Sequence, residues 1–389
     1  MRNDRFVELA ERYGTPLYVY DAEKIAERCR KVLELFAGFD FLPMFAVKAN
    51  NNPNILKLVH SHGFGADVVT RGEFRACELA GIPPEMLVWN GNGKTREDME
   101  YFIEHGIRYV NIDSFEEMEL WNEKLPRCAS IIFLVRVNPN IDPKTHPHIS
   151  TGTKMHKFGV DEDQIEKFMK KFGRTVKGVH IHVGSQITDV KVFVEAYSRA
   201  LELCERYSLE YLNIGGGWGI AYKGKGLDIE DYKKKAIPIL KKFKGRIILE
   251  LGRYIVGEAG YLILKVVQVK RTMTKVFVVT DGGMNQLIRP ALYDAYHEIE
   301  ILNATDEETM VDVVGPLCET GDMIARERKM KLPRVGSYLI VEGAGAYGYS
   351  MSNNYNSTLR AAEVLISGKG EQLIRKRETL DDLFRSVIP

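Results

Sequence analysis

Cysteine is scarce in this chain, and its spacing excludes two kinds of stabilising framework. The five cysteines among 389 residues are widely scattered and form no C-x-x-C pair, so the sequence predicts neither a zinc site nor a disulfide framework. Unpaired cysteines fit a reducing compartment, and we expect a cytoplasmic protein. The opening residues also lack the apolar segment of a signal peptide.

Long apolar runs and an excess of charge are absent too. No stretch approaches the roughly 20 apolar residues of a membrane-spanning helix, so no membrane segment is predicted. Lysine and arginine total 54 against 53 for aspartate and glutamate, and this net charge of +1 argues against nucleic acid or an anionic membrane as the main partner. A hydrophobic content of 45% is typical of a globular protein, and the length favours two domains.

Strand-like runs alternate with segments of helical spacing through the first part of the chain. Such an alternation predicts a parallel sheet, and eight repeats in this length fit a (β/α)₈ barrel of the TIM type better than an open sheet. The predicted strands are Phe41–Val47, Ala66–Val69, Leu87–Trp89, Tyr109–Ile112, Ile131–Val137, Val179–Val183, Tyr211–Ile214 and Ile247–Leu251.

The pattern changes after about Tyr261, where β-rich segments are separated by glycine and other turn residues. This part is predicted to form a smaller β domain of sandwich or barrel type. The early strand-like run Pro16–Tyr20 precedes the first barrel helix, and we assign it to the same β domain. We therefore predict a barrel domain over residues 22–262 and a β domain built from residues 1–21 and 263–389.

The ends of barrel strands usually carry the chemistry, which draws attention to Lys48 at the end of the first strand. A lysine that closes a buried strand is expected to be partly desolvated, which lowers its pKa and frees the amine as a nucleophile. Such an amine suits carbonyl chemistry, above all a Schiff base with pyridoxal phosphate (PLP). The alternative is a solvated lysine just past a strand, since lysine is mostly exposed.

A run of three glycines, Gly215 to Gly217, follows the seventh predicted strand. Residues without Cβ let backbone N–H groups approach an anion, and the loops after strands seven and eight of such barrels often bind phosphate. The run is not a P-loop, because no Gly-Lys-Ser/Thr follows it. A phosphate site is therefore predicted here, with a simple tight turn as the alternative.

Polar residues mark the sixth and eighth strands. Glu250 ends an apolar strand, where its carboxylate either pairs with nearby Arg253 or faces a pyridine nitrogen and keeps it protonated. His180 and His182 lie two apart and share a face, but no third ligand with suitable spacing follows, so no metal is predicted. A histidine packed against a flat cofactor ring is the favoured interpretation.

One further candidate lies in a turn-rich loop of the β domain. Cys318 and Glu319 are adjacent there, among turn residues and charged neighbours. A lone cysteine is usually a small buried hydrophobe, and that is the alternative to a thiol that acts as an acid or base.

Taken together, these segments resemble the alanine-racemase-like (fold type III) PLP enzymes, and within them the diaminopimelate decarboxylases. The resemblance covers nearly the whole chain in order, with Leu251 standing where the family usually has proline and His156 where it usually has serine. The matching segments are Phe45–Asn50, His180–Gln186, Gly215–Gly217, Glu250–Arg253, Asp281–Asn285, Arg289–Tyr293, Cys318–Asp322 and Gly345–Tyr349.

The resemblance implies a role for each matching residue. Lys48 would hold PLP covalently and Cys318 would donate a proton, while His182 would stack on the ring and Glu250 would pair with its nitrogen. The implied cofactor-binding residues are Lys48, Asp67, His182, Ser185, Gly215, Gly216, Gly217, Glu250, Gly252, Arg253 and Tyr347. The implied substrate-binding residues are Arg253, Arg289, Tyr293, Glu319 and Tyr347.

The activity implied is PLP-dependent decarboxylation of meso-2,6-diaminopimelate to L-lysine and CO₂, the last step of lysine biosynthesis, in a homodimer whose sites are shared between subunits. One alternative is another enzyme of this fold: a decarboxylase of ornithine, arginine or carboxynorspermidine, or a racemase. Another is a non-catalytic PLP-binding or regulatory relative. The pair Arg289 and Tyr293 suits a distal carboxylate and argues against ornithine-type substrates.

Overall fold

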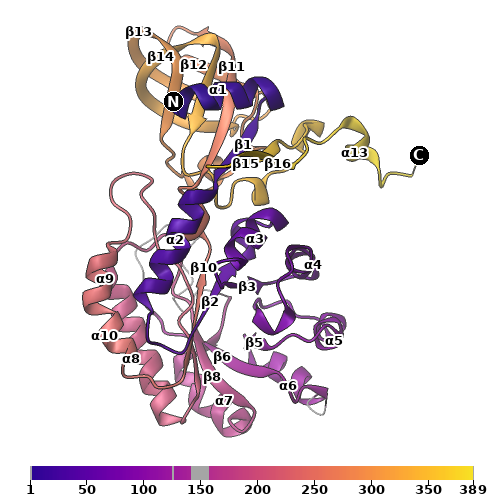
Figure 1. The fold of residues 1–389 in the computed structure, drawn as a ribbon, viewed down its shortest axis with the longest axis vertical. Coiled ribbons are helices and arrows are strands. Elements are labelled where there is room, and N and C mark those ends of the chain that lie inside the picture. Colours follow the sequence, from indigo (N-terminus) through magenta and orange to yellow (C-terminus); the bar gives the residue numbers. More distant parts are fainter. Residues whose placement is uncertain (1, 125–126, 142–156, 389) are drawn as a thin grey trace. The chain divides into compact units, whose positions relative to one another are not determined.

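The chain divides into two compact units, which we call the barrel unit and the sheet unit (Figure 1). The computed structural model describes residues 2–124, 127–141 and 157–388, so His156 lies outside the described residues. The barrel unit comprises Ala26–Ala221 and Lys225–Ile255, and the sheet unit comprises Met1–Ile25, Tyr222–Gly224 and Val256–Pro389. The domain bounds predicted from the sequence, 22–262 for the barrel and 1–21 with 263–389 for the β domain, stay a prediction.

Eight parallel strands close into a ring in the barrel unit, which confirms the predicted fold. Each strand pairs in parallel with the next, and the last pairs with the first through Ile247 opposite Phe41. A two-residue strand, β7 (Val160–Asp161), adds to the edge of β6. The ring strands are β2 (Phe41–Ala46), β3 (Gly65–Val68), β4 (Leu87–Trp89), β5 (Tyr109–Ile112), β6 (Ile132–Asn138), β8 (Val176–Ile181), β9 (Tyr211–Asn213) and β10 (Arg246–Leu251).

Helices follow the strands and lie around the outside of the ring (Figure 1). Two short helices rather than one long helix lie between β9 and β10, because Pro238 cannot donate an N–H to a continuous helix. The helices are α2 (Ala22–Leu35), α3 (Pro53–His60), α4 (Arg71–Ala80), α5 (Arg96–Glu104), α6 (Phe115–Asn122), α7 (Ile165–Phe172), α8 (Val190–Arg206), α9 (Ile229–Lys235), α10 (Ile237–Leu240) and α11 (Arg253–Val256).

Capping side chains fix where these helices begin. Asn52, Thr70, Thr95, Ser114 and Asp189 each accept a hydrogen bond from a backbone N–H of the first turn that follows. Each cap satisfies a donor that a helix start would otherwise leave open, typically worth about 1 kcal/mol. The caps therefore set the length of the loops between strand ends and helices, which is where the functional side chains lie.

The inside of the barrel has an apolar layer and a polar layer. Leu134 and Ile248 belong to a buried apolar cluster inside the ring. Because residues two apart on a strand share a face, Arg136 and Glu250 follow them on the inner side. Both polar residues are buried, so the carboxyl ends of the strands enclose charged groups rather than more apolar packing.

The sheet unit is mainly one seven-stranded sheet, as predicted for the second domain. β1 pairs antiparallel with β11 and parallel with β15, so the early strand does join this unit. β12 pairs with both β11 and β13, which closes β11 to β14 into a small barrel. The strands are β1 (Leu17–Asp21), β11 (Gly260–Arg271), β12 (Val276–Thr280), β13 (Ile299–Val314), β14 (Met323–Val341), β15 (Ala362–Ser367) and β16 (Gly370–Arg375).

Three helices complete the sheet unit: α1 (Arg2–Tyr13), α12 (Arg289–Tyr293) and α13 (Leu380–Phe384). Helix α1 was not predicted from the sequence. Its Phe6 and Leu9 pack into the apolar cluster that includes Val19, Ile263 and Val364. Within the part of the chain that is described, no helix has the length and apolar character needed to cross a membrane.

Candidate active site

Lys48 and Asp67 form an ion pair at the carboxyl ends of neighbouring strands. Lys48 lies in a short 3₁₀ turn, Val47–Ala49, directly after β2, and its Nζ donates to Asp67 Oδ2 at 3.0 Å. The Asp67 side chain is fully buried, whereas 45% of the Lys48 side chain is exposed. Burial raises the pKa of Asp67, and the Lys48 ammonium opposes that rise.

This pairing bears on the pKa expected for Lys48. We expected burial to depress the pKa of the lysine, and that expectation stays a prediction; the fully buried member of the pair is the carboxylate. The amine of Lys48 has a proton acceptor, Asp67, at hydrogen-bond distance, and the sequence did not predict this pairing.

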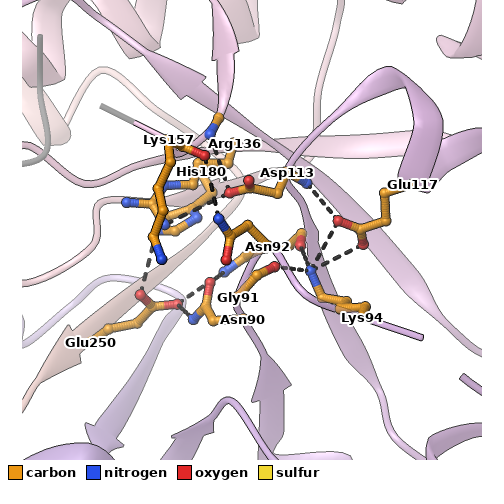
Figure 2. Close-up of polar contacts among 12 residues, drawn as sticks. Asn90, Gly91, Asn92, Lys94, Asp113, Glu117, Arg136, Lys157, His180 and Glu250 are labelled. Atoms are coloured by element: carbon orange, nitrogen blue, oxygen red, sulfur yellow. Dashed lines mark hydrogen bonds and ion pairs between the residues drawn. The ribbon is translucent and has the colours of Figure 1, made fainter. Parts of the chain in front are cut away.

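Glu250 is the centre of a buried hydrogen-bond network (Figure 2). Its Oε1 accepts from the side-chain amides of Asn90 at 2.9 Å, Asn111 at 3.0 Å and Asn213 at 2.6 Å. Its Oε2 lies 3.4 Å from Nε2 of His180. One carboxylate oxygen is thus held by three neutral donors, and the other faces a histidine that has no hydrogen-bond partner among the described residues.

The network keeps Glu250 ionised. Burial raises the pKa of its carboxyl, but the neighbouring His180 and Lys48 and the Asn90 amide outweigh burial and hold that pKa well below its usual range. A permanently charged carboxylate in a water-poor site can keep a protonated ring nitrogen charged. The role that the sequence suggested for Glu250 stays a prediction.

The three asparagines were missed in the sequence. Asn111 and Asn213 lie in strands β5 and β9, two residues after Tyr109 and Tyr211, which contact the apolar interior cluster. A polar residue two positions after an inward apolar residue shares its face, so the signal was present in the spacing. Asparagine is too common in loops for that spacing alone to have identified the site.

His182 and the glycine run are joined by a hydrogen bond. The backbone N–H of Gly216 donates to Nδ1 of His182 at 3.1 Å, so that nitrogen is unprotonated. Burial, with Arg136 and Lys48 nearby, lowers the pKa of His182 well below its usual value. The imidazole is therefore neutral, and its orientation is fixed by the loop after β9.

The glycines are required by close contacts between main chains. A Cβ on Gly216 would lie 1.9 Å from the carbonyl oxygen of Glu250. Gly215 and Gly217 have φ values of +62° and +96°, and a Cβ on either would lie 2.3 Å from a carbonyl oxygen of the neighbouring loop. The N–H of Gly215 donates to Asn213 Oδ1 at 3.0 Å.

The contact at Gly216 leaves no space for a side chain, because any Cβ there would strike the main chain of Glu250. Two N–H groups of the run, those of Gly215 and Gly216, already donate within the protein. The loop is tightly packed, and its binding of phosphate stays a prediction.

Ser185, Gly252 and Arg253 complete the barrel side of the predicted site. Nη2 of Arg253, the first residue of α11, donates to Oγ of Ser185 at 3.0 Å. A Cβ on Gly252 would lie 2.7 Å from Cβ of Ala49, which is next to Lys48. The loops after β2, β8 and β10 are thus in direct contact. No group of three His, Cys, Asp or Glu suited to a metal occurs among the residues described.

The remaining predicted residues belong to the sheet unit. Arg289 is buried on α12, where its Nη1 lies 2.8 Å from Nε2 of His297 and its guanidinium lies 4.5 Å from the ring centre of Tyr222. Tyr293 follows one turn later and is half-buried. His297 and Tyr222 were not predicted. Only their contacts with Arg289 identify them.

Cys318 and Glu319 are exposed in the turn that follows β13. The N–H of Cys318 donates to Asn356 Oδ1 at 2.9 Å, and Glu319 Oε1 accepts from the N–H of Gly321 at 3.1 Å. Tyr347 is half-buried with φ +58° in a separate loop. The thiol is therefore open to solvent in one chain, unlike the other four cysteines, which are buried.

Comparison with known proteins agrees with this geometry. The family model for the pyridoxal binding domain of pyridoxal-dependent decarboxylases matches residues 22–257. Diaminopimelate decarboxylase of Aquifex aeolicus is 43% identical over 392 residues, spanning 96% of this chain and 92% of its own. That of Methanocaldococcus jannaschii is 40% identical over 411 residues, spanning 98% and 93%.

Solved structures give the same result. Diaminopimelate decarboxylase from Helicobacter pylori, as a mutant complexed with L-lysine, matches with a TM-score of 0.92 and 35% identity over 98% of both chains. The M. jannaschii enzyme in complex with L-lysine matches with a TM-score of 0.91 and 39% identity over 98% of this chain and 94% of that one. With identity of this order along nearly its whole length, the chain belongs to the diaminopimelate decarboxylase family of pyridoxal-dependent decarboxylases, whose cofactor is pyridoxal phosphate.

Proposed function

We propose that this protein removes CO₂ from meso-2,6-diaminopimelate and yields L-lysine. The observation that carries the proposal is the convergence of Lys48, Asp67 and an ionised Glu250 at the carboxyl ends of the barrel strands. That set supplies an amine for a carbonyl cofactor and a fixed negative charge for a pyridine nitrogen. Its chemistry fits pyridoxal phosphate.

Each barrel residue has a task in this proposal. PLP, when bound, supplies the ring that accepts the electron pair left behind as CO₂ departs. Lys48 would bind the cofactor aldehyde, Asp67 would accept a proton from its amine, and Glu250 would hold the proton on the ring nitrogen. His182, kept neutral and fixed by Gly216, would lie against the ring, and Ser185, Gly252 and the glycine run would bind the phosphate, a role that the resemblance also implies for Tyr347.

The residues proposed to recognise the substrate lie mostly in the sheet unit. Arg289 and Tyr293 would bind the distal carboxylate and Glu319 the distal ammonium, and the resemblance implies substrate binding by Arg253 and Tyr347 as well. Because His297 Nε2 accepts from Arg289, part of the guanidinium is held in place before substrate arrives. The thiol of Cys318 would deliver its proton to the substrate Cα.

We propose further that the enzyme is a homodimer, in which Cys318 and Glu319 of one subunit serve the site of its partner. The solvent exposure of Cys318 within one chain agrees with a thiol that acts outside its own subunit. A cytoplasmic location belongs to the same proposal, because the cysteines are all unpaired, as a reducing compartment would keep them.

A side-by-side assay tests the substrate. CO₂ release is measured with meso-diaminopimelate, ornithine, arginine and carboxynorspermidine. A buried arginine left without its carboxylate is costly, so we expect kcat/KM for meso-diaminopimelate to exceed the value for ornithine by roughly 10³-fold or more. If any of the other three is used more efficiently, the substrate assignment is wrong even though the decarboxylase assignment stands.

A further inference from the structure

A second buried ion pair lies behind the site, between Lys94 and Glu117 (Figure 2). Lys94 follows β4 in the loop before α5, and Glu117 lies in the first turn of α6. Only 2% of the Lys94 side chain and 8% of the Glu117 side chain are exposed. Neither residue has a part in any step of the proposed reaction.

All three donors of the Lys94 ammonium are used. Its Nζ donates to the carbonyl oxygens of Gly91 at 2.6 Å and Asn111 at 2.8 Å, and to Glu117 Oε2 at 3.1 Å. Glu117 Oε2 also accepts from the N–H of Asp113 at 2.9 Å. The pair therefore ties together the main chain after β4 and the main chain of β5.

Stability alone is a weak reason for such a pair. Removing two charges from water commonly costs as much as their attraction returns, and an apolar pair of the same size is often equally stable. The position of the pair suggests a different reason. The two carbonyl groups that Lys94 binds belong to Asn111 and to the neighbour of Asn90, and both asparagine side chains donate to Oε1 of Glu250.

The two asparagines also depend on each other. Nδ2 of Asn111 donates to Oδ1 of Asn90 at 2.7 Å, and Nδ2 of Asn90 donates to Oδ1 of Asp67 at 2.6 Å. A shift of either main-chain segment would therefore move the amide groups that donate to Glu250 and to Asp67, which is the partner of Lys48. Figure 2 shows the sequence of contacts from Glu117 through Lys94 and Gly91 to Asn90 and Glu250.

We propose that Lys94 is a positioning residue for Glu250. By fixing the carbonyl groups of Gly91 and Asn111, it sets the direction of the two amides that hold Glu250 Oε1 and leaves Oε2 for the cofactor nitrogen. The inference rests on the proposed role of Glu250. Glu117 supplies the counter-charge that lets the ammonium stay buried.

The test removes both charges together, because either alone would leave an unpaired buried charge. In Lys94→Met/Glu117→Gln the size of each side chain is nearly kept, but the two carbonyl groups lose their donor. We expect the dissociation constant of PLP to rise about tenfold, equivalent to about 1.4 kcal/mol. The pH profile of the visible absorbance of the PLP-loaded protein should shift, and kcat should fall about tenfold with KM within about twofold of wild type.

Tyr232→Phe is the matched control. It removes a buried hydrogen bond in the same unit, between the Tyr232 and Tyr197 hydroxyls at 2.8 Å, and should lower the melting temperature without changing PLP affinity or absorbance. A double variant that melts lower but keeps the wild-type PLP dissociation constant and absorbance profile would overturn the inference. If that double variant does not fold, Lys94→Leu/Glu117→Gln takes its place, because it also removes both charges, and wild-type PLP affinity in it would overturn the inference as well.

Glu250→Gln separates this inference from the proposed function. If Glu250→Gln leaves the absorbance profile unchanged, the role of Glu250 is wrong, and the inference fails with it. If Glu250→Gln changes the profile while the Lys94→Met/Glu117→Gln variant does not, only the positioning role of Lys94 is wrong.

Discussion

Lys48 is the residue on which the chemistry depends, and its surroundings make a direct test possible. The amine has Asp67 at 3.0 Å as its acceptor, and nearly half of the side chain is open to solvent. Lys48→Ala should abolish both the visible absorbance of protein-bound PLP and the covalent adduct left by borohydride reduction, because no amine remains to bind the aldehyde.

Peptide mapping of the reduced protein is the measurement. Lys57→Ala, which removes an exposed lysine of α3, is the control and should keep both the absorbance and the adduct. An adduct that maps to a lysine other than Lys48 in the wild-type protein would show that the assignment is wrong.

Glu73 gives a prediction about pH at the same scale. Burial raises the pKa of Glu73 to about 6, above its ordinary value, and the backbone N–H of Val69 works against the rise. The folded protein therefore binds a proton more tightly than the unfolded chain, and stability falls as pH rises through this window. Glu73→Gln removes the free-energy cost of ionising this buried carboxyl.

We expect Glu73→Gln to be more stable than wild type by about 1 kcal/mol at pH 7.5, after allowance for solvent screening, and to show no gain at pH 4. Thermal unfolding at the two pH values measures the difference. An equal gain at both pH values would point to packing, and a loss at pH 7.5 would mean that the charged carboxylate is the better acceptor for Val69.

At the scale of elements, spacing predicted the ring strands well because each is short, apolar and bounded by turn residues. It predicted the site less completely. Lys48, Glu250 and the glycine run stand at strand ends, where position alone suggests chemistry. Asn90, Asn111 and Asn213 were missed because their importance comes from converging on one oxygen atom, and convergence depends on the closing of the ring rather than on local sequence.

The glycine loop after β9 should tolerate almost no side chain. A Cβ on Gly216 would lie 1.9 Å from the Glu250 carbonyl oxygen, and backbone at that distance must move. Gly216→Ala is expected to lower the free energy of unfolding by roughly 3 kcal/mol and to weaken PLP binding, because the same main chain carries Glu250.

Gly93→Ala is the matched control for that variant, since a Cβ there would meet no atom within 4 Å. Thermal unfolding and PLP titration of both variants are the measurements. Equal stability and equal PLP affinity of Gly216→Ala and Gly93→Ala would contradict the close packing described for the loop after β9.

At the scale of the whole molecule, the predicted residues fall into two groups. Those that would hold the cofactor lie mostly in the barrel unit, and those that would read the substrate and donate the proton lie mostly in the sheet unit. This division allows a complementation experiment, because one variant can damage the barrel contribution and another the sheet contribution. Lys48 and Cys318 are the natural pair.

Lys48→Ala and Cys318→Ala proteins should each be inactive, and mixing them should restore activity if Cys318 serves the partner subunit. Random re-pairing makes about half of the dimers mixed, and each mixed dimer holds one intact site, so recovery should reach at most about a quarter of the wild-type value. Decarboxylase activity after subunit exchange is the measurement, with exchange followed by mass difference. A mixture that exchanges fully yet stays inactive would place Lys48 and Cys318 of one active site in the same chain.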